Sequence, residues 1–204
     1  EFAPRQTGLT VNAWKHYAYE PGAQGKAVAE ALADPAVAAQ LAKGPVVIVA
    51  GRANLAESTA STVAALQQLL AAVPGSKVLP AYRRGNVVGA LQLGLHNTGD
   101  GLDVRNILKA SAEGRIECLI VVGADPLSDF PDATLARKGI EGARRLVVVD
   151  SFLSATAQQA SVVLPASMWA EKSGTTTNIE GRVTTVAQQV NPAGTARADW
   201  MIAA

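Results

Sequence analysis

Short runs of β-branched and aliphatic residues alternate along the chain with stretches of helical periodicity, and this order restricts the fold more than any other feature. The runs are apolar throughout, so we expect both faces of these strands to be covered. Strands that alternate with helices join through right-handed crossovers into a mostly parallel sheet. The sequence therefore predicts an α/β fold with a doubly wound, Rossmann-like, mostly parallel sheet. The expected strands are PVVIVAG, KVLP, IECLIVVG, RRLVVVD and SVVLPAS.

Helical patterns lie between these strands. Residues 23–43 show one that we expect to break near Pro35, because proline disrupts the interior of a helix. Residues 57–73 show another, which Ser58 or Thr59 could cap by accepting a backbone N–H. Two further helices are expected in LDVRNILKASAEG and DATLARKGIEG. The alternation of helix and strand is thus maintained through most of the chain.

The order of these elements divides the chain into three expected parts. We predict an N-terminal leader and helix at 1–43, the Rossmann-like domain at 44–165, and a C-terminal hairpin with a truncated helix at 166–204. The glycine-punctuated segment 81–101 is expected to be a connection. Because the tail RADWMIAA resembles the first turn of a helix, we expect a fragment of a larger protein.

Composition argues against several classes of function. Eighteen basic residues against seventeen acidic ones leave a net charge of +1 and no concentrated basic face for nucleic acid. No apolar run approaches the ~18 residues of a membrane span, and the N-terminus lacks the pattern of a signal peptide. Cys118 is the single cysteine, beside two histidines, so neither a disulfide within the chain nor a four-ligand Cys/His site can form. We expect Cys118 to be an inert core residue and predict no metal site.

Three strand ends are candidates for a ligand site, because parallel sheets bind ligands at the carboxyl ends of their strands. The turn GRANLAES at 51–58 matches neither GxGxxG nor GxxxxGK[ST], so we interpret it as an ordinary strand-to-helix turn. In GADP, Gly123 permits a positive φ, and Asp125 before Pro126 is held extended with its carboxylate projecting from the strand end. Asp150 ends the next strand. Each aspartate either contacts a nucleotide or caps the turn that follows it.

Taken together, VVGADPLSDFPD and VVVDSFLSATAQQASVVLPASMWAEKSGTTTNIEGRV resemble the molybdopterin oxidoreductase family. The resemblance covers 81–204, and GNVVGALQLG is similar to the family's Asn-x-x-Gly-Ala loop. In catalytic members the Gly-Thr-x-Thr-Asn hairpin approaches a pyranopterin guanine dinucleotide. The resemblance therefore implies cofactor-binding positions at Thr175, Thr177 and Asn178. It also places the nucleotide portion of such a ligand near a second set of positions, namely Gly123, Asp125, Pro126 and Asp150.

Two departures from the catalytic pattern favour one branch of the family. Catalytic members usually carry Asn at the place of Asp125 and often Arg at the place of Gly181. An anionic Asp125 would repel a phosphate, and Gly181 removes an anion partner. The GADP and NxEGRV forms look like the large iron–sulfur subunit of proton-translocating NADH–quinone oxidoreductase, respiratory complex I.

That branch implies a scaffold domain within an electron-transfer enzyme that carries electrons from NADH through FMN and iron–sulfur clusters to quinone. It implies no cofactor in this fragment, no catalysis by the fragment alone, and iron–sulfur clusters elsewhere in the full-length subunit. The implied partners are other subunits of the peripheral arm, at the cytoplasmic face of the bacterial inner membrane, without membrane insertion.

Two alternatives remain open. A fragment of a molybdopterin guanine dinucleotide enzyme, of the formate dehydrogenase or nitrate reductase type, would use the same loops to hold its cofactor. A free-standing nucleotide-binding α/β module would bind a nucleotide by itself. On the scaffold interpretation, we expect Asn178→Ala to act only through hairpin hydrogen bonds and Val121→Ala to lower stability more, by leaving a cavity.

Overall fold

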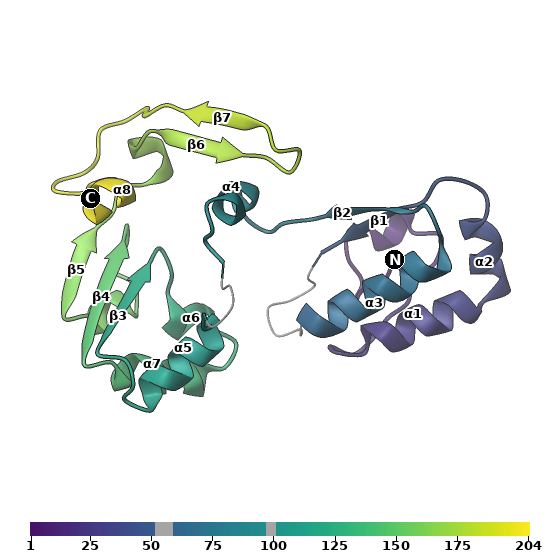
Figure 1. Cartoon of the computed structure of the whole chain (residues 1–204), viewed down its shortest axis with the longest axis horizontal. Coiled ribbons are helices and arrows are strands. Elements are labelled where there is room, and N and C mark those ends of the chain that lie inside the picture. Colours follow the sequence, from purple (N-terminus) through teal and green to yellow (C-terminus); the bar gives the residue numbers. More distant parts are fainter. Residues whose placement is uncertain (52–58, 97–100) are drawn as a thin grey trace. The chain divides into compact units, whose positions relative to one another are not determined.

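The computed structural model describes residues 1–51, 59–96 and 101–204, and the possible cap at Ser58 lies outside the described residues. The chain divides into two compact units, Glu1–Arg83 and Arg84–Ala204 (Figure 1). The boundary between them falls inside the range 44–165, for which we predicted one domain. The α/β class is confirmed, since parallel strands alternate with helices in both units.

The first unit contains a two-stranded parallel sheet, in the order β1-β2, together with helices. Its elements are η1 (Thr10–Asn12), α1 (Gln24–Ala33), α2 (Pro35–Leu41), β1 (Val47–Ala50), α3 (Thr59–Ala72) and β2 (Lys77–Pro80). The expected break at Pro35 is confirmed, because Pro35 begins α2 as its first residue. Asp34 caps that helix by accepting a hydrogen bond from the Ala36 N–H at 2.9 Å.

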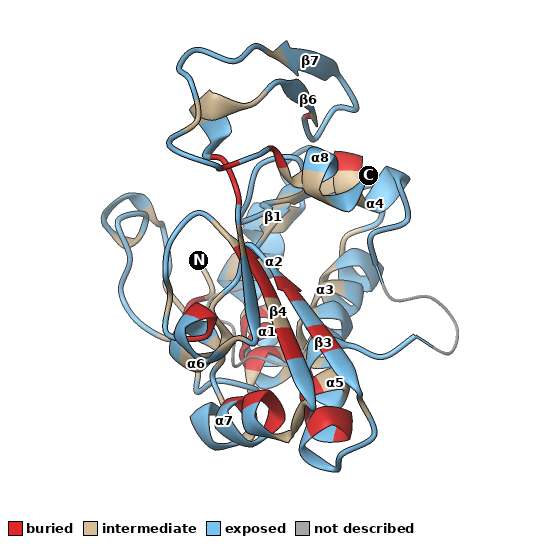
Figure 2. Ribbon diagram, turned by 90° about the vertical axis from the view of Figure 1, so that its left-hand side faces the viewer, coloured by how far each residue is buried: buried red, intermediate tan, exposed pale blue. Residues whose placement is uncertain are grey.

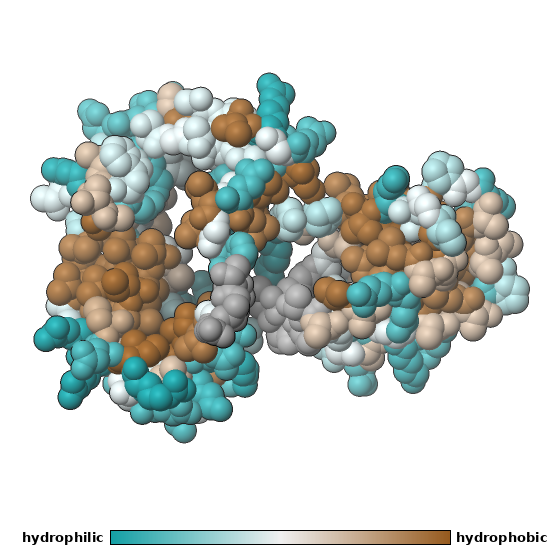
Figure 3. All heavy atoms as spheres, viewed as in Figure 1, coloured by the Kyte–Doolittle hydropathy of each residue, from teal (hydrophilic) through white to brown (hydrophobic). Residues whose placement is uncertain are grey.

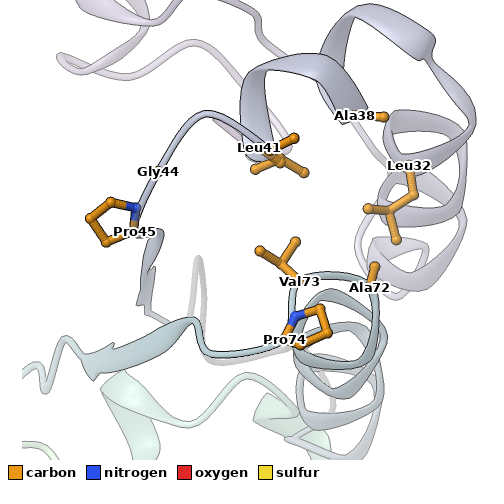
Figure 4. A pocket seen from close by; sticks show the side chains of 9 residues that line it. Leu32, Ala38, Leu41, Gly44, Pro45, Ala72, Val73 and Pro74 are labelled. Atoms are coloured by element: carbon orange, nitrogen blue, oxygen red, sulfur yellow. The ribbon is translucent and has the colours of Figure 1, made fainter.

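An open apolar pocket of about 660 Å³ is lined by residues of α1, α2 and α3 and of the segments that follow α2 and α3 (Figure 4). Its lining residues are Leu32, Ala38, Leu41, Ala42, Gly44, Pro45, Ala72, Val73 and Pro74. None of these side chains is titratable or can donate a hydrogen bond, so the pocket offers apolar contact but no acid–base or ligating chemistry.

The second unit contains a three-stranded parallel sheet and an antiparallel hairpin. The sequence predicts the parallel strands and the hairpin, but it places the strands of both units in one sheet. The sheet order is β3-β4-β5, and β6 pairs with β7. The elements up to the last sheet strand are α4 (Val87–Gln92), α5 (Val104–Ala112), β3 (Cys118–Val122), α6 (Pro126–Asp129), α7 (Ala133–Gly142), β4 (Arg145–Asp150), η2 (Ala157–Gln159) and β5 (Val162–Pro165). The remaining ones are η3 (Trp169–Glu171), β6 (Gly174–Thr177), β7 (Val183–Val186) and α8 (Asp199–Ala203).

The core of the second unit lies on one face of the sheet, where buried side chains of β3 and β4 pack with Ile140 of α7. Burial alternates along β3, so that Leu119 and Val121 are buried whereas Ile120 is 61% exposed (Figure 2). The prediction that both faces of these strands are covered is therefore wrong for β3, and the surface over the strands is apolar (Figure 3). Cys118 is also exposed, which corrects its predicted place in the core.

Helices α5 and α7 approach each other closely because α7 carries glycine at the contact. A Cβ on Gly139 would lie 2.8 Å from the backbone oxygen of Leu108, and one on Gly142 would lie 2.2 Å from the backbone oxygen of Ser111. The Ser111 hydroxyl donates a hydrogen bond to the Gly139 carbonyl oxygen at 2.6 Å. The two glycines thus allow the helix contact that covers the sheet.

Candidate functional site at the carboxyl ends of the strands

The carboxyl ends of β3 and β4 lie side by side, since these strands pair in parallel from Cys118 with Arg145 to Val122 with Val149. The loop after β3 turns at Gly123, whose φ of +59° is in the left-handed region and whose N–H bonds the Val149 carbonyl at 2.9 Å. The pairing therefore brings the GADP loop next to the segment that follows Asp150, at the edge where a ligand would be expected.

The Asp125 carboxylate accepts four hydrogen bonds from within the chain. One oxygen accepts from the backbone N–H of Thr156 at 3.0 Å and from its hydroxyl, and the other accepts from the Ser128 hydroxyl at 2.7 Å and the Ala155 N–H at 3.2 Å. Thr156 is fully buried, and its hydroxyl oxygen also accepts from the Leu127 N–H. Asp125 therefore ties the loop after β3 to the segment after β4.

Acid should weaken this connection. Burial by itself would raise the pKa of Asp125, but hydrogen bonds from Thr156, Ser128 and Ala155 outweigh it and hold the pKa below the ordinary value of an aspartate. A folded-state pKa below the unfolded one means that the stabilisation is complete above pH ~4 and is lost as the pH falls through the folded-state pKa. In urea unfolding measured at decreasing pH, we expect Asp125→Asn to lose less stability below about pH 4 than the parent. Parallel pH profiles for the two proteins would contradict this.

The Asp150 carboxylate caps the turn that follows its strand. One oxygen accepts from the N–H groups of Ser151 at 2.7 Å and Phe152 at 3.3 Å, and the other accepts from the Ser154 hydroxyl at 3.1 Å. Pro126 begins the short helix α6 as its first residue, where its missing N–H has no consequence. Both aspartates at the strand ends are therefore engaged in turn and loop geometry.

The hairpin is held to a segment far away in the sequence. The buried Thr177 donates its N–H to the side-chain oxygen of Asn86 at 2.8 Å, across 91 residues. Asn86 precedes α4 with a φ of +59°, and a Cβ on Gly89 would lie only 2.2 Å from that same oxygen. Asn86 thus anchors the hairpin, and the glycine three residues later leaves room for the Asn86 side chain. The sequence shows this spacing but does not reveal the contact.

Asn178 closes the hairpin turn. Its side-chain oxygen accepts hydrogen bonds from the Glu180 N–H at 3.0 Å and the Arg182 N–H at 2.8 Å, and Gly181 supplies the positive φ of +81° that the turn requires. Thr175 is exposed on β6, and among the described residues no hydrogen bond links the hairpin positions to Asp125 or Asp150. The predicted site residues therefore form two groups.

We expect Asn178→Ala to lower the free energy of unfolding by about 1 kcal/mol, because it removes the acceptor of two exposed turn hydrogen bonds. Asn178→Asp keeps an oxygen acceptor and should retain most of that stability. The measurement is urea unfolding of the three proteins side by side. If Asn178→Ala lowered the free energy of unfolding as much as Val121→Ala, which creates a core cavity, the two turn hydrogen bonds could not account for the loss.

These contacts bear on whether a phosphate-containing dinucleotide fits. The two strand ends present carboxylates, which repel phosphate, and their oxygens already accept hydrogen bonds from the protein. The Asn178 oxygen and the Thr177 N–H are also engaged within the chain. Of the positions implied by the family resemblance, only the Thr175 side chain projects from an exposed residue without a hydrogen bond in the described structure. The arrangement fits such a cofactor poorly.

The described part of the chain holds no group of three or more His, Cys, Asp or Glu side chains that could bind a metal ion. Within the same residues, no helix combines the length and apolar character needed to cross a bilayer.

Comparison with known proteins finds relatives that are subunits of oxidoreductases. The chain is 34% identical over 147 residues to the NADPH-Fe(3+) oxidoreductase subunit alpha of Geobacter sulfurreducens, covering 61% of this chain and 17% of that one. It is 42% identical over 106 residues to the F420-dependent formate dehydrogenase subunit alpha of Methanocaldococcus jannaschii, covering 52% and 16%. It is 41% identical over 102 residues to an NADH-quinone oxidoreductase subunit of Rhizobium meliloti, covering 50% and 12%.

The chain spans less than a fifth of the length of each of these relatives. A family model described as molybdopterin oxidoreductase matches residues 2–204, which is nearly the whole sequence. The chain therefore belongs to the molybdopterin oxidoreductase family.

Proposed function

We propose that this chain is a scaffold domain of the large peripheral subunit of an NADH–quinone oxidoreductase and binds no pterin cofactor itself. The observation that carries the proposal is the Asp125 carboxylate, which accepts four hydrogen bonds from Ser128, Ala155 and Thr156. This carboxylate is negatively charged, and its oxygens already accept hydrogen bonds from within the chain. It therefore holds the loops in position and offers no hydrogen-bond donor to a phosphate. The identity of 41% to an NADH-quinone oxidoreductase subunit supports this branch.

In this role the domain supports electron transfer without carrying electrons. Iron–sulfur clusters would reside in other parts of the same subunit, and FMN and quinone sites in partner subunits of the peripheral arm. The arm would lie at the cytoplasmic face of the bacterial inner membrane. The domain would contribute by holding its strand-end loops in fixed positions, which the hydrogen bonds of Asp125 and Asp150 provide.

A second candidate is a domain of a molybdopterin enzyme of the formate dehydrogenase type. The identity of 42% to a formate dehydrogenase alpha subunit favours it, as does the hydrogen bond by which Asn86 anchors the hairpin at Thr177. In that case the Thr175 hydroxyl would be the group of this chain free to contact the pterin, and the cofactor would supply the redox centre.

Elemental analysis and native mass spectrometry of the full-length protein separate the two candidates. The scaffold proposal predicts iron but no stoichiometric molybdenum or tungsten, and no mass corresponding to a pterin dinucleotide. A stoichiometric pterin guanine dinucleotide with molybdenum or tungsten would overturn it. If that were found, loss of the pterin in Thr175→Val, which removes the hydroxyl but keeps the shape, would assign the contact to this chain.

A further inference from the structure

Helix α1 of the first unit buries a polar side chain on its apolar face. The residues that it buries share one face of the helix, since they recur at i, i+3, i+4 and i+7, and they are Gln24, Ala27, Val28 and Ala31. Gln24 is the polar one, and it is only 6% exposed. Its side-chain oxygen and nitrogen are both buried, and neither has a hydrogen-bond partner among the described residues. Such an amide has lost its hydrogen bonds to water without replacing them, so it needs an explanation.

The buried amide lies at the amino end of α1, where backbone donors are also unpaired. Gln24 is the first residue of the helix, and Cβ bonds in a helix tilt toward its N-terminus, so this side chain reaches back over that end. Ala23, at the N-cap position, has no side-chain acceptor for the first turn. Lys26 and Ala27 donate to the Ala23 carbonyl oxygen, whereas the N–H groups of Gln24 and Gly25 make no hydrogen bond within the described part of the chain.

A second glutamine reaches the same turn from α3. Helices α1 and α3 pack against each other (Figure 1), and a Cβ on Gly25 would lie 3.4 Å from the side-chain nitrogen of Gln68. The Gln68 amide therefore lies against the first turn of α1, and it too has no hydrogen-bond partner among the described residues. Gly25 is partly exposed and Gln68 is exposed, so solvent and small solutes reach this turn. Two amides and two backbone N–H groups thus meet at one helix end.

A ligand that suits these groups accepts several hydrogen bonds and donates one. The backbone N–H groups and the amide nitrogens are donors, and they lie at the end of the helix where the macrodipole is positive. The buried oxygen of Gln24, in contrast, needs a donor. Inorganic phosphate keeps at least one O–H at neutral pH and otherwise presents acceptor oxygens, whereas sulfate has no O–H to donate. Hydrogen phosphate therefore matches both the helix end and the two atoms of the buried amide.

We propose that the amino end of α1 binds inorganic phosphate through the amides of Gln24 and Gln68 and the N–H groups of Gln24 and Gly25. The nearest charged residues along the chain, Glu20 and Lys26, are exposed and opposite in sign, so the hydrogen-bond donors select the anion and a net charge does not. All of these residues belong to the first unit. The site involves no redox cofactor and no partner subunit, and it is therefore independent of the proposed function.

Isothermal titration calorimetry of the full-length polypeptide with sodium phosphate at neutral pH tests the site. Sodium sulfate and sodium chloride at the same ionic strength serve as comparison salts. We expect saturable phosphate binding with a Kd on the order of 0.1–1 mM, as suits a small ligand held by a few hydrogen bonds. Sulfate should bind roughly tenfold more weakly or less, because it leaves the Gln24 oxygen without a donor. Chloride should give no saturable heat.

Three variants assign the binding to this helix end. Gln24→Leu keeps the size of the side chain, suits the apolar face of α1 and removes both polar atoms, so it should fold and yet lower the phosphate affinity at least ~tenfold. Thermal unfolding without phosphate confirms that the variant is folded. Gln68→Ala should weaken phosphate binding several-fold. Gln67→Ala is the matched control, because it removes the neighbouring exposed glutamine of α3, and its affinity should equal that of the parent.

Four results would overturn the proposal. The first is the absence of saturable phosphate binding up to about 10 mM, which would mean that water alone occupies the buried amide. The second is an unchanged phosphate affinity in Gln24→Leu, which would place the binding elsewhere. The third is an equal loss of affinity in Gln67→Ala and Gln68→Ala. The fourth is sulfate binding as tight as phosphate binding, because the oxygen of the Gln24 amide would then have no role.

Discussion

Asp125→Ala should lower the free energy of unfolding of this chain by about 2–4 kcal/mol. The substitution removes a carboxylate that accepts hydrogen bonds from Ser128, Ala155 and both donors of Thr156. Hydrogen bonds to a charged group contribute about 1.5–3 kcal/mol each, but a half-exposed site recovers part of this through water. The larger share of the loss arises at Thr156, which is fully buried and would be left with unpaired donors.

Urea unfolding followed by tryptophan fluorescence gives the measurement, since Trp169 and Trp200 both report on the second unit. Asp125→Asn is the matched control, because its amide retains one oxygen acceptor and should lose roughly half as much stability. A loss below about 0.5 kcal/mol for Asp125→Ala would mean that water replaces the carboxylate without cost. The positioning role argued for Asp125 would then fail.

Gly139→Ala should destabilise the second unit by about 2–3 kcal/mol, although alanine is the better helix former by about 1 kcal/mol. The new methyl group would lie 2.8 Å from both the backbone oxygen and a side-chain methyl of Leu108, and 2.9 Å from its Cβ. Because the backbone of α5 cannot rotate away as a side chain can, α7 must move. That movement would break the hydrogen bond from the Ser111 hydroxyl to the Gly139 carbonyl.

Gly174→Ala serves as the control for the second unit, since a Cβ there meets no atom within 4 Å and the residue does not have a positive φ. It should change stability by no more than about 0.5 kcal/mol. Thermal unfolding of the two variants beside the parent measures the difference. A Gly139→Ala protein as stable as the parent would show that the contact between α5 and α7 is looser than the structure indicates.

Much of the secondary structure could be predicted because its causes are local. The strand KVLP appears as β2 at Lys77–Pro80, and the break at Pro35 follows from a ring that cannot continue a helix. The parallel pairing of β3, β4 and β5 follows from their alternation with helices, and the hairpin from its turn residues. The sequence does not predict the short helix α4 within 81–101, since the glycines of that segment hide the pattern of a helix of only 6 residues.

The positions of the candidate-site residues could be predicted from the sequence, but their hydrogen-bond partners could not. The sequence marks Asp125, Asp150, Thr177 and Asn178, because they lie near strand ends and in family motifs. It could not assign their partners, since Asp125 bonds Thr156 across 31 residues and Thr177 bonds Asn86 across 91. Which donor bonds a carboxylate depends on how two segments distant in the sequence approach each other in the fold. The local sequence does not reveal that approach.

The sequence alone determined the α/β class, the parallel strands and the family, since these depend on hydrophobic period and on the order in which elements and motifs follow one another along the chain. Tertiary structure alone decided that Ile120 and Cys118 face outward while Leu119 and Val121 face the core. It also decided that the strand-end aspartates hold loops in place. Burial and hydrogen-bond partners are set by what packs against a residue, and a chain acquires that environment only when distant segments meet.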